Sequence, residues 1–222
     1  MAAKCGASDL VDGRDWRDLA QGHIDVAFVC SPPLIWLGGA VEAIAAPVLT
    51  HPDFGGRPLY TSDVIVKRDS TFQSLDDLKG SRWAINEPSS WSGFWVTLQR
   101  VRSWSFFGNV VAAGFHQRAL RMVATGNVDG AAIDCHVLAV ELHNHPELAD
   151  QLRVVETLGP APSQPVVVRS SLPFSIKARV REQLLDLRGA TLNEFFVERF
   201  VPAPDYSSIA AVVGSKPSTP AL

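Results

Sequence analysis

The sequence predicts an α/β protein of two lobes with mixed, mostly parallel sheets, because one pattern occurs twice and strands alternate with helices. In residues 19–28 and again in 123–132, a helical segment ends at a glycine, a polar residue follows, and an apolar strand begins. Glycine suits a left-handed helix cap, and the strand after it completes a helix-to-strand unit. Two such units indicate two lobes. The alternative is that Gly-x-Ile/Val-Asp is merely a common loop between a helix and a strand.

The remaining elements alternate in the same way. Short helices are expected at 74–78 and 175–187, the first ending before Gly80 and the second before Gly189. Alternation of this kind is typical of an α/β fold. The Ser/Pro-rich tail at 215–222 is expected to be disordered. Strands are expected at 64–67, 82–86, 153–158 and 166–168.

Composition limits the function. The chain has 222 residues, 46% of them hydrophobic, with a net charge of −3 and a pI near 6.1. Without a basic field, nucleic acid is not an expected partner. The apolar stretches are too short to cross a bilayer, and Met1–Leu10 does not have the pattern of a secretory signal. The spacing of the three cysteines indicates neither a disulfide framework nor a zinc site, and no cofactor is expected.

The segment 86–94 carries the clearest sign of a binding site. A strand ends there, a hydroxyl-rich loop follows, and a helical pattern begins near Gly93. The N–H groups of a first helical turn, together with the hydroxyls of Ser90 and Ser92, are suited to an oxyanion. Gly93 allows a ligand to approach the backbone. The alternative is that one of these serines simply caps the helix.

Two further side chains are candidates for the same site. His116 lies at the start of a second helical pattern and can donate to a phosphate or phosphonate oxygen, or it can be a capping or surface histidine. Asp134 follows the strand 130–133, at the end where open α/β sheets present binding groups. It can accept a hydrogen bond from a protonated ligand oxygen or pair with a ligand ammonium. Alternatively, it holds its own turn.

Two patterns are weaker. Cys135 and His136 suggest a thiol nucleophile with its base, but neighbours on a strand point to opposite faces and do not meet. His143 and His145 suggest a metal site, but no third ligand stands at a recognisable spacing. A solvated helix end explains these two histidines better, and no metal site is predicted.

Taken together, these motifs resemble the phosphonate-binding family of periplasmic solute-binding proteins, partners of ATP-binding-cassette (ABC) importers. The resemblance covers most of the chain, and it depends on the order and spacing of the motifs more than on any one of them. The motifs are Gly22–Phe28, Pro58–Ser62, Val64–Val66, Ser74–Gly80, Ser90–Gly93, Gly114–His116, Gly126–Asp134, Phe200–Pro202 and Asp205–Tyr206.

The resemblance implies a type II periplasmic-binding-protein fold of two lobes. One lobe is expected to comprise residues 1–61 with 160–222, and the other 62–159. The ligand is expected between the lobes, and the protein is expected to be a monomer. The family's opening strand, helix and second strand have no counterpart, so the N-terminal lobe is expected to be incomplete, as after a gene start placed too far downstream. The implied ligand-binding residues are Ser90, Trp91, Ser92, His116, Asp134, Tyr60 and Trp16.

The implied function is capture of a small oxyanion, such as phosphonate, phosphite or phosphate, for an ABC permease in the membrane. No catalysis is expected. The implied compartment is the periplasm, although the absent signal pattern leaves the cytoplasm open. Trp91 stands where a small hydroxyl residue is expected, which favours a ligand that is larger, flatter or less richly hydrogen-bonded than a simple phosphonate. The alternatives are an enzyme that resembles the pyrimidine synthases of thiamin biosynthesis, and a sensory domain on the same fold.

Overall fold

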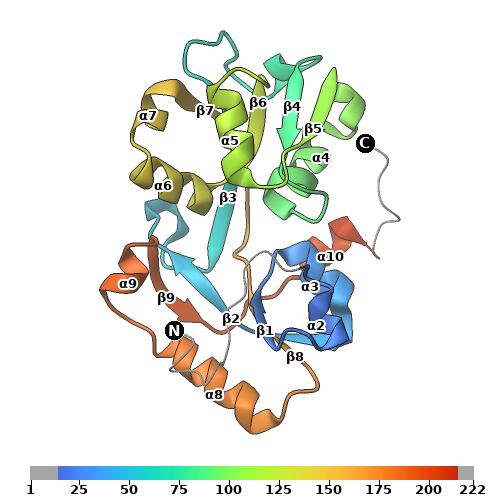
Figure 1. Cartoon of the computed structure of the whole chain (residues 1–222), viewed down its shortest axis with the longest axis vertical. Coiled ribbons are helices and arrows are strands. Elements are labelled where there is room, and N and C mark those ends of the chain that lie inside the picture. Colours follow the sequence, from blue (N-terminus) through green and yellow to red (C-terminus); the bar gives the residue numbers. More distant parts are fainter. Residues whose placement is uncertain (1–14, 215–222) are drawn as a thin grey trace. The chain divides into compact units, whose positions relative to one another are not determined.

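The computed structural model describes residues 15–214, which form two compact α/β units. The first unit comprises 15–59 with 162–214, and the second comprises 60–161. Figure 1 shows the elements of each unit. The predicted disordered tail at 215–222 lies outside the described residues. No helix in the described part of the chain is long and apolar enough to cross a membrane.

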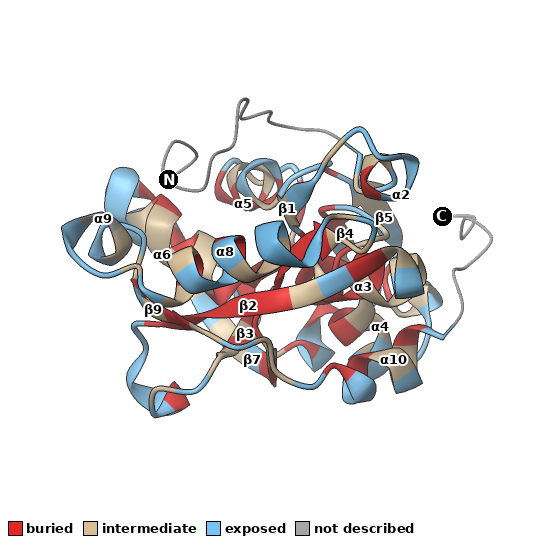
Figure 2. Cartoon of the chain, turned by 90° about the horizontal axis from the view of Figure 1, so that it is seen from below, coloured by how far each residue is buried: buried red, intermediate tan, exposed pale blue. Residues whose placement is uncertain are grey.

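The first unit is built on a four-stranded sheet of order β1-β8-β2-β9. Figure 2 shows that β2 is buried along much of its length, as its apolar sequence requires. The strands are β1 (Val26–Phe28), β2 (Val41–Leu49), β8 (Val166–Arg169) and β9 (Val197–Val201), and the helices are α2 (Asp18–Gln21), α3 (Ser31–Leu37), α8 (Phe174–Leu185), α9 (Ala190–Asn193) and α10 (Ser207–Val213).

The second unit is built on a five-stranded sheet of order β5-β4-β6-β3-β7. Helix α5 packs on β4 and β6 (Figure 1). The strands are β3 (Leu59–Lys67), β4 (Arg82–Ile85), β5 (Asn109–Ala112), β6 (Gly130–Asp134) and β7 (Leu152–Pro162). The helices are α4 (Val96–Val101), α5 (His116–Ala124), α6 (Cys135–Asn144) and α7 (Glu147–Gln151), and short 3₁₀ or π turns are Gly38–Ala40, Pro52–Phe54, Asp76–Leu78, Trp91–Trp95 and Trp104–Phe106.

The second sheet is mixed, as predicted, but the expectation of mostly parallel sheets is wrong for the first unit, whose neighbouring strands all pair antiparallel. Strand β8 pairs antiparallel with both β1 and β2, and β9 pairs antiparallel with β2. The helix α3 does connect two strands that run in the same direction, β1 and β2, but β8 returns from the other unit and inserts between them. In the second unit β4 pairs parallel with β5 and β6, while β3 runs antiparallel to β6. The sequence pattern predicts the crossover helices but not the inserted strand.

The repeated helix-to-strand pattern forms the same local structure in both units. Gly22 and Gly126 have φ of 79° and 75°, the left-handed conformation expected of a helix stop. In the first unit, the aspartate that follows, Asp25, accepts from the Arg169 guanidinium at 2.6 Å. In the second unit, Asp129 accepts from Arg82 in the same way, at 2.6 Å. The carboxylate of each motif therefore fastens a helix-to-strand loop to an arginine on a nearby strand.

Apolar side chains between the second sheet and its helices form the core that supports the candidate site. Helix α5 contributes a stripe at the spacing expected of an amphipathic helix, and β4 and β6 contribute small residues that let it pack closely. This core fixes the position of the first residue of α5, which is His116. The buried members are Ile65, Ala84, Ala113, Ala119, Leu120, Val123, Ala124, Val128, Ala131, Ile133, Leu138, Leu148 and Leu152.

Candidate anion-binding site

The hydroxyl-rich loop after β4 begins a helix with a π-helical turn. The turn Trp91–Trp95 continues into α4, and its first intrahelical bond runs from the Trp95 N–H to the Ser90 carbonyl at 3.2 Å. The N–H groups of residues 91–94 precede that bond and stand at the positive end of the helix dipole. Such turns are frequent at functional sites. The first turn therefore has the features of an anion-binding helix start.

The two serines of the loop have different roles. The Ser90 hydroxyl accepts from the Gly93 N–H at 3.0 Å, which makes Ser90 the N-cap of this helix. The Ser92 hydroxyl lies 3.0 Å from His116 Nε2 and 3.4 Å from the Ser90 hydroxyl. Both serines are buried. The capping alternative is thus correct for Ser90, and Ser92 is the serine that meets the predicted histidine.

His116 is the first residue of α5 and is half-buried. Loss of hydration lowers the pKa of His116, and the negative charge of Asp134 opposes this shift. The imidazole is therefore neutral at neutral pH. A neutral ring carries one N–H and one lone pair, so it can either donate to or accept from the Ser92 hydroxyl.

Asp134 ends β6 and caps the helix that follows. Its Oδ1 accepts from the N–H groups of His136 at 2.8 Å and Val137 at 3.3 Å. The alternative of a carboxylate that holds its own turn is correct. In the antiparallel β3–β6 ladder, Asp134 stands opposite Ser62, whose hydroxyl donates to the Ser92 carbonyl at 2.6 Å. Asp134 therefore remains close enough for its charge to act on His116.

The expectation that Cys135 and His136 lie on a strand is wrong, because Asp134 starts helix α6 one residue before them. The reason is the capping preference of aspartate, which ends the strand at the carboxylate itself. The Cys135 sulfur accepts from the Thr61 N–H at 3.3 Å. Burial raises the pKa of the Cys135 thiol to about 11, and Asp134 adds to the effect. The thiol is therefore protonated at neutral pH and unsuited to act as a nucleophile.

The other predicted site residues belong to three different segments of the chain. Trp91 is the first residue of the π turn and is buried, and Tyr60 is 1% exposed in β3. Trp16 belongs to the first unit, where its ring lies 5.8 Å from that of Trp36. His145, near the end of α6, lies 3.6 Å from Glu147, and the described residues contain no group of three or more side chains suited to a metal.

Two residues of the site were not predicted. Ser62 is a buried hydroxyl in β3, and it fixes the Ser92 carbonyl. Asn86 follows β4, and its carbonyl accepts from the Gly114 N–H at 2.7 Å, which ties the loop to the segment before His116. The signal for Asn86 was present in the sequence, since a polar residue at the carboxyl end of a parallel strand is a candidate binding group.

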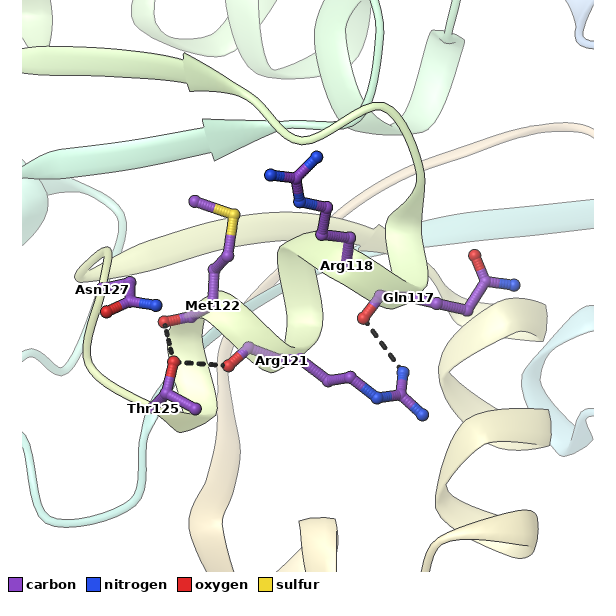
Figure 3. A pocket seen from close by; sticks show the side chains of 6 residues that line it. All are labelled: Gln117, Arg118, Arg121, Met122, Thr125 and Asn127. Carbon is purple, nitrogen blue, oxygen red and sulfur yellow. Dashed lines mark hydrogen bonds between the residues drawn. The ribbon is translucent and has the colours of Figure 1, made fainter.

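A groove of about 350 Å³ lies along the outer side of α5 (Figure 3). Its polar groups mostly bond within the second unit, since the Thr125 hydroxyl donates to the Arg121 carbonyl and the Arg121 guanidinium binds Glu141 at 2.8 Å. We assign no binding role to this groove. The residues that line it are Gln117, Arg118, Arg121, Met122, Thr125 and Asn127.

Comparison with known proteins decides the family. The model of a family described as the periplasmic substrate-binding protein of phosphonate ABC transporters matches residues 16–207. The chain belongs to this family. Members of this family are substrate-binding transport proteins, and the two mixed α/β units agree with their type II periplasmic-binding fold.

Individual relatives agree with this membership. The phosphonates-binding periplasmic protein of Escherichia coli (strain K12) is 29% identical over 158 residues, which is 67% of this chain and 46% of that protein. The chain thus spans about half the length of this curated relative.

Two solved structures share the fold. The binding component of a phosphonate ABC transporter from Pseudomonas aeruginosa has a TM-score of 0.79 at 22% identity, covering 95% of this chain and 75% of its own. PhnD1 from Prochlorococcus marinus (MIT 9301), solved in complex with methylphosphonate, has a TM-score of 0.81 at 16% identity, covering 96% and 87%.

Proposed function

We propose that this member of the family captures a small oxyanion of the phosphonate, phosphite or phosphate class at the start of the Trp91–Val101 helix. The observation that carries the proposal is the contact of Ser92 with His116 beside that helix start, at 3.0 Å. A hydroxyl, an imidazole and the first turn of a helix converge there, and these supply the donors that an oxyanion requires. The phosphonate family and the methylphosphonate complex of a similar fold support this ligand class.

The proposed role is delivery of the bound anion to an ABC permease, without a bond made or broken. The protein would act as a monomer in the periplasm, which is the compartment of the family. The convergent groups need no catalytic base for this role, because binding depends on hydrogen bonds and the helix dipole alone. Sedimentation of the purified protein, with and without methylphosphonate, measures the oligomeric state.

Calorimetric titration with methylphosphonate, phosphite, phosphate and sulfate tests the proposal. We expect saturable binding of one phosphorus oxyanion by the wild-type protein. Ser92→Ala removes one hydrogen bond to a charged ligand, which is worth about 1.5–3 kcal/mol, or roughly a 10- to 100-fold loss of affinity. His145→Ala is the matched control and should bind like the wild type, since His145 pairs with Glu147 at the end of α6.

An unchanged affinity in the Ser92→Ala protein would remove the anion site from this loop. A folded wild-type protein that binds none of the four anions would instead reject this ligand class. Thermal unfolding distinguishes folded protein from damaged protein, and a ligand specific for the folded state raises the midpoint.

A further inference from the structure

Two polar atoms next to Gly93 are buried without a hydrogen-bond partner in the described part of the chain. They are Oδ1 of Asn86, a residue that is 8% exposed, and Nδ1 of His116. Buried polar groups are hydrogen-bonded in the great majority of cases, so an exception calls for a reason. Neither atom has a structural role in the capping and pairing described above.

The two side chains meet at the face of Gly93. A Cβ added to Gly93 would lie 2.0 Å from Asn86 Oδ1 and 3.1 Å from His116 Cε1, the ring carbon between the two nitrogens. Because Gly93 has no side chain, the Asn86 carboxamide and the edge of the His116 ring can both approach it on the same side. The 2.7 Å bond from the Gly114 N–H to the Asn86 carbonyl holds the two chain segments at this spacing.

Few charges act on the imidazole. From the side of β4 and its loop, the groups next to His116 are Asn86 and Ser92, and neither of them is charged. From the side of β6 and α6, Asp134 is the charged group whose field reaches the ring. An anion bound by Ser92 would add a second negative charge beside the imidazole, which favours its protonated form.

We propose that Asn86 is a positioning residue for a proton-coupled His116. When an oxyanion binds at Ser92, His116 takes up one proton from solvent and becomes an imidazolium with two N–H donors. Nε2–H then faces Ser92 and the ligand, and Nδ1–H donates to Asn86 Oδ1. This inference rests on the proposed function, and it gives both unpartnered atoms a role in the ligand-bound state.

An amide suits the position of residue 86 for electrostatic reasons. An aspartate in place of Asn86 would repel the anion, and an apolar residue would leave the imidazolium N–H buried without an acceptor. The carboxamide oxygen of Asn86 accepts a hydrogen bond from the imidazolium N–H without adding a charge. The consequence is that affinity rises as the pH falls toward the ordinary pKa of histidine, for a ligand of constant charge.

Calorimetry with methylphosphonate in two buffers of different ionisation enthalpy measures the protons taken up on binding. We expect the wild-type protein at pH 7.5 to take up about 0.5–1 proton more than His116→Gln, because the ligand's own titration is common to both. Asn86→Leu, of similar size, should lose that uptake and bind roughly 10-fold more weakly. Asn86→Asp places a carboxylate beside the imidazole, which favours the imidazolium before the ligand binds, so this variant should take up fewer protons on binding than the wild type. Uptake in Asn86→Leu equal to the wild type would overturn the proposal.

A measurement without ligand separates this inference from the proposed function. The ring nitrogens of His116 are followed by ¹⁵N NMR, with the signal assigned by its loss in His116→Gln. We expect His116 to titrate at a lower pH in Asn86→Leu than in the wild type, because the imidazolium has lost its acceptor. If His116 titrates at the same pH in Asn86→Leu and in the wild type, the Asn86–His116 pairing is rejected, whether or not the protein binds anions. Absence of anion binding together with a shifted titration rejects the proposed function alone.

Discussion

Gly93→Ala tests the packing that forms the site. The added methyl group would stand 2.0 Å from Asn86 Oδ1 and 2.7 Å from its Cγ, distances that real side chains do not adopt. Either the carboxamide or the π turn must move, and overpacking of this kind costs typically about 1–3 kcal/mol. Alanine recovers roughly 0.5–1 kcal/mol within a helix. We expect a net loss of about 1–2 kcal/mol in the free energy of unfolding.

Urea denaturation of four proteins measures the coupling. Asn86→Ala removes the atoms that the new methyl group would meet, so the double variant Asn86→Ala/Gly93→Ala should recover most of the stability lost in Gly93→Ala. We expect a coupling free energy of about 1–2 kcal/mol between the two positions. The reasoning fails if Gly93→Ala is as stable as the wild type, or if the two changes are additive. The midpoint and the slope are both needed, because a changed slope reports a changed unfolded state.

Three further predictions follow from the same contacts. Ser90→Ala removes the cap on the Gly93 N–H and should lower the free energy of unfolding by about 0.5–2 kcal/mol, measured by urea denaturation. Cys135, with its pKa raised to about 11, should react with iodoacetamide at pH 8 only when the protein is unfolded, as mass spectrometry will show. Because burial lowers the pKa of His116, its contribution to stability is present above the ordinary histidine pKa and is lost as the pH falls through the lower folded-state pKa. In His116→Gln, the thermal midpoint should therefore fall less steeply with decreasing pH over this range than in the wild type. An equally steep fall in both proteins would contradict the predicted direction of the pKa shift.

The sequence predicts the fold well where local signals and burial agree. Both glycine-stopped helices lead into strands, β1 and β6, because a left-handed glycine and an apolar run are local features. The direction of β8 is not predictable in this way. Its four residues read as a buried strand, but their antiparallel place between β1 and β2 depends on the path of the chain from the other unit.

The candidate site was predicted in part, for a similar reason. The Ser90–Gly93 loop and His116 are local signals at helix starts, and the structure brings Ser92 and His116 together. The carboxylate of Asp134 was expected, but Cys135 and His136, the first residues of the helix that it caps, were read as strand, because its capping role competes with the apolar run before it. Asn86 was missed as a partner of Gly93, since nothing in the sequence shows which residue fills the space that a glycine leaves.

The contacts among the site residues also bear on how tightly an anion can bind. The Ser90 hydroxyl already accepts from Gly93, and the Ser92 hydroxyl already contacts His116, so a ligand must share or replace bonds that exist without it. Exchange of one hydrogen bond for another yields little net free energy. The gain must come from interactions that the ligand-free protein cannot make, namely the hydrogen bond of Ser92 to a charged oxygen, the helix dipole acting on the anion and the charge that His116 acquires. On this reasoning, removal of the charge on His116 should weaken binding more than removal of the Ser90 hydroxyl.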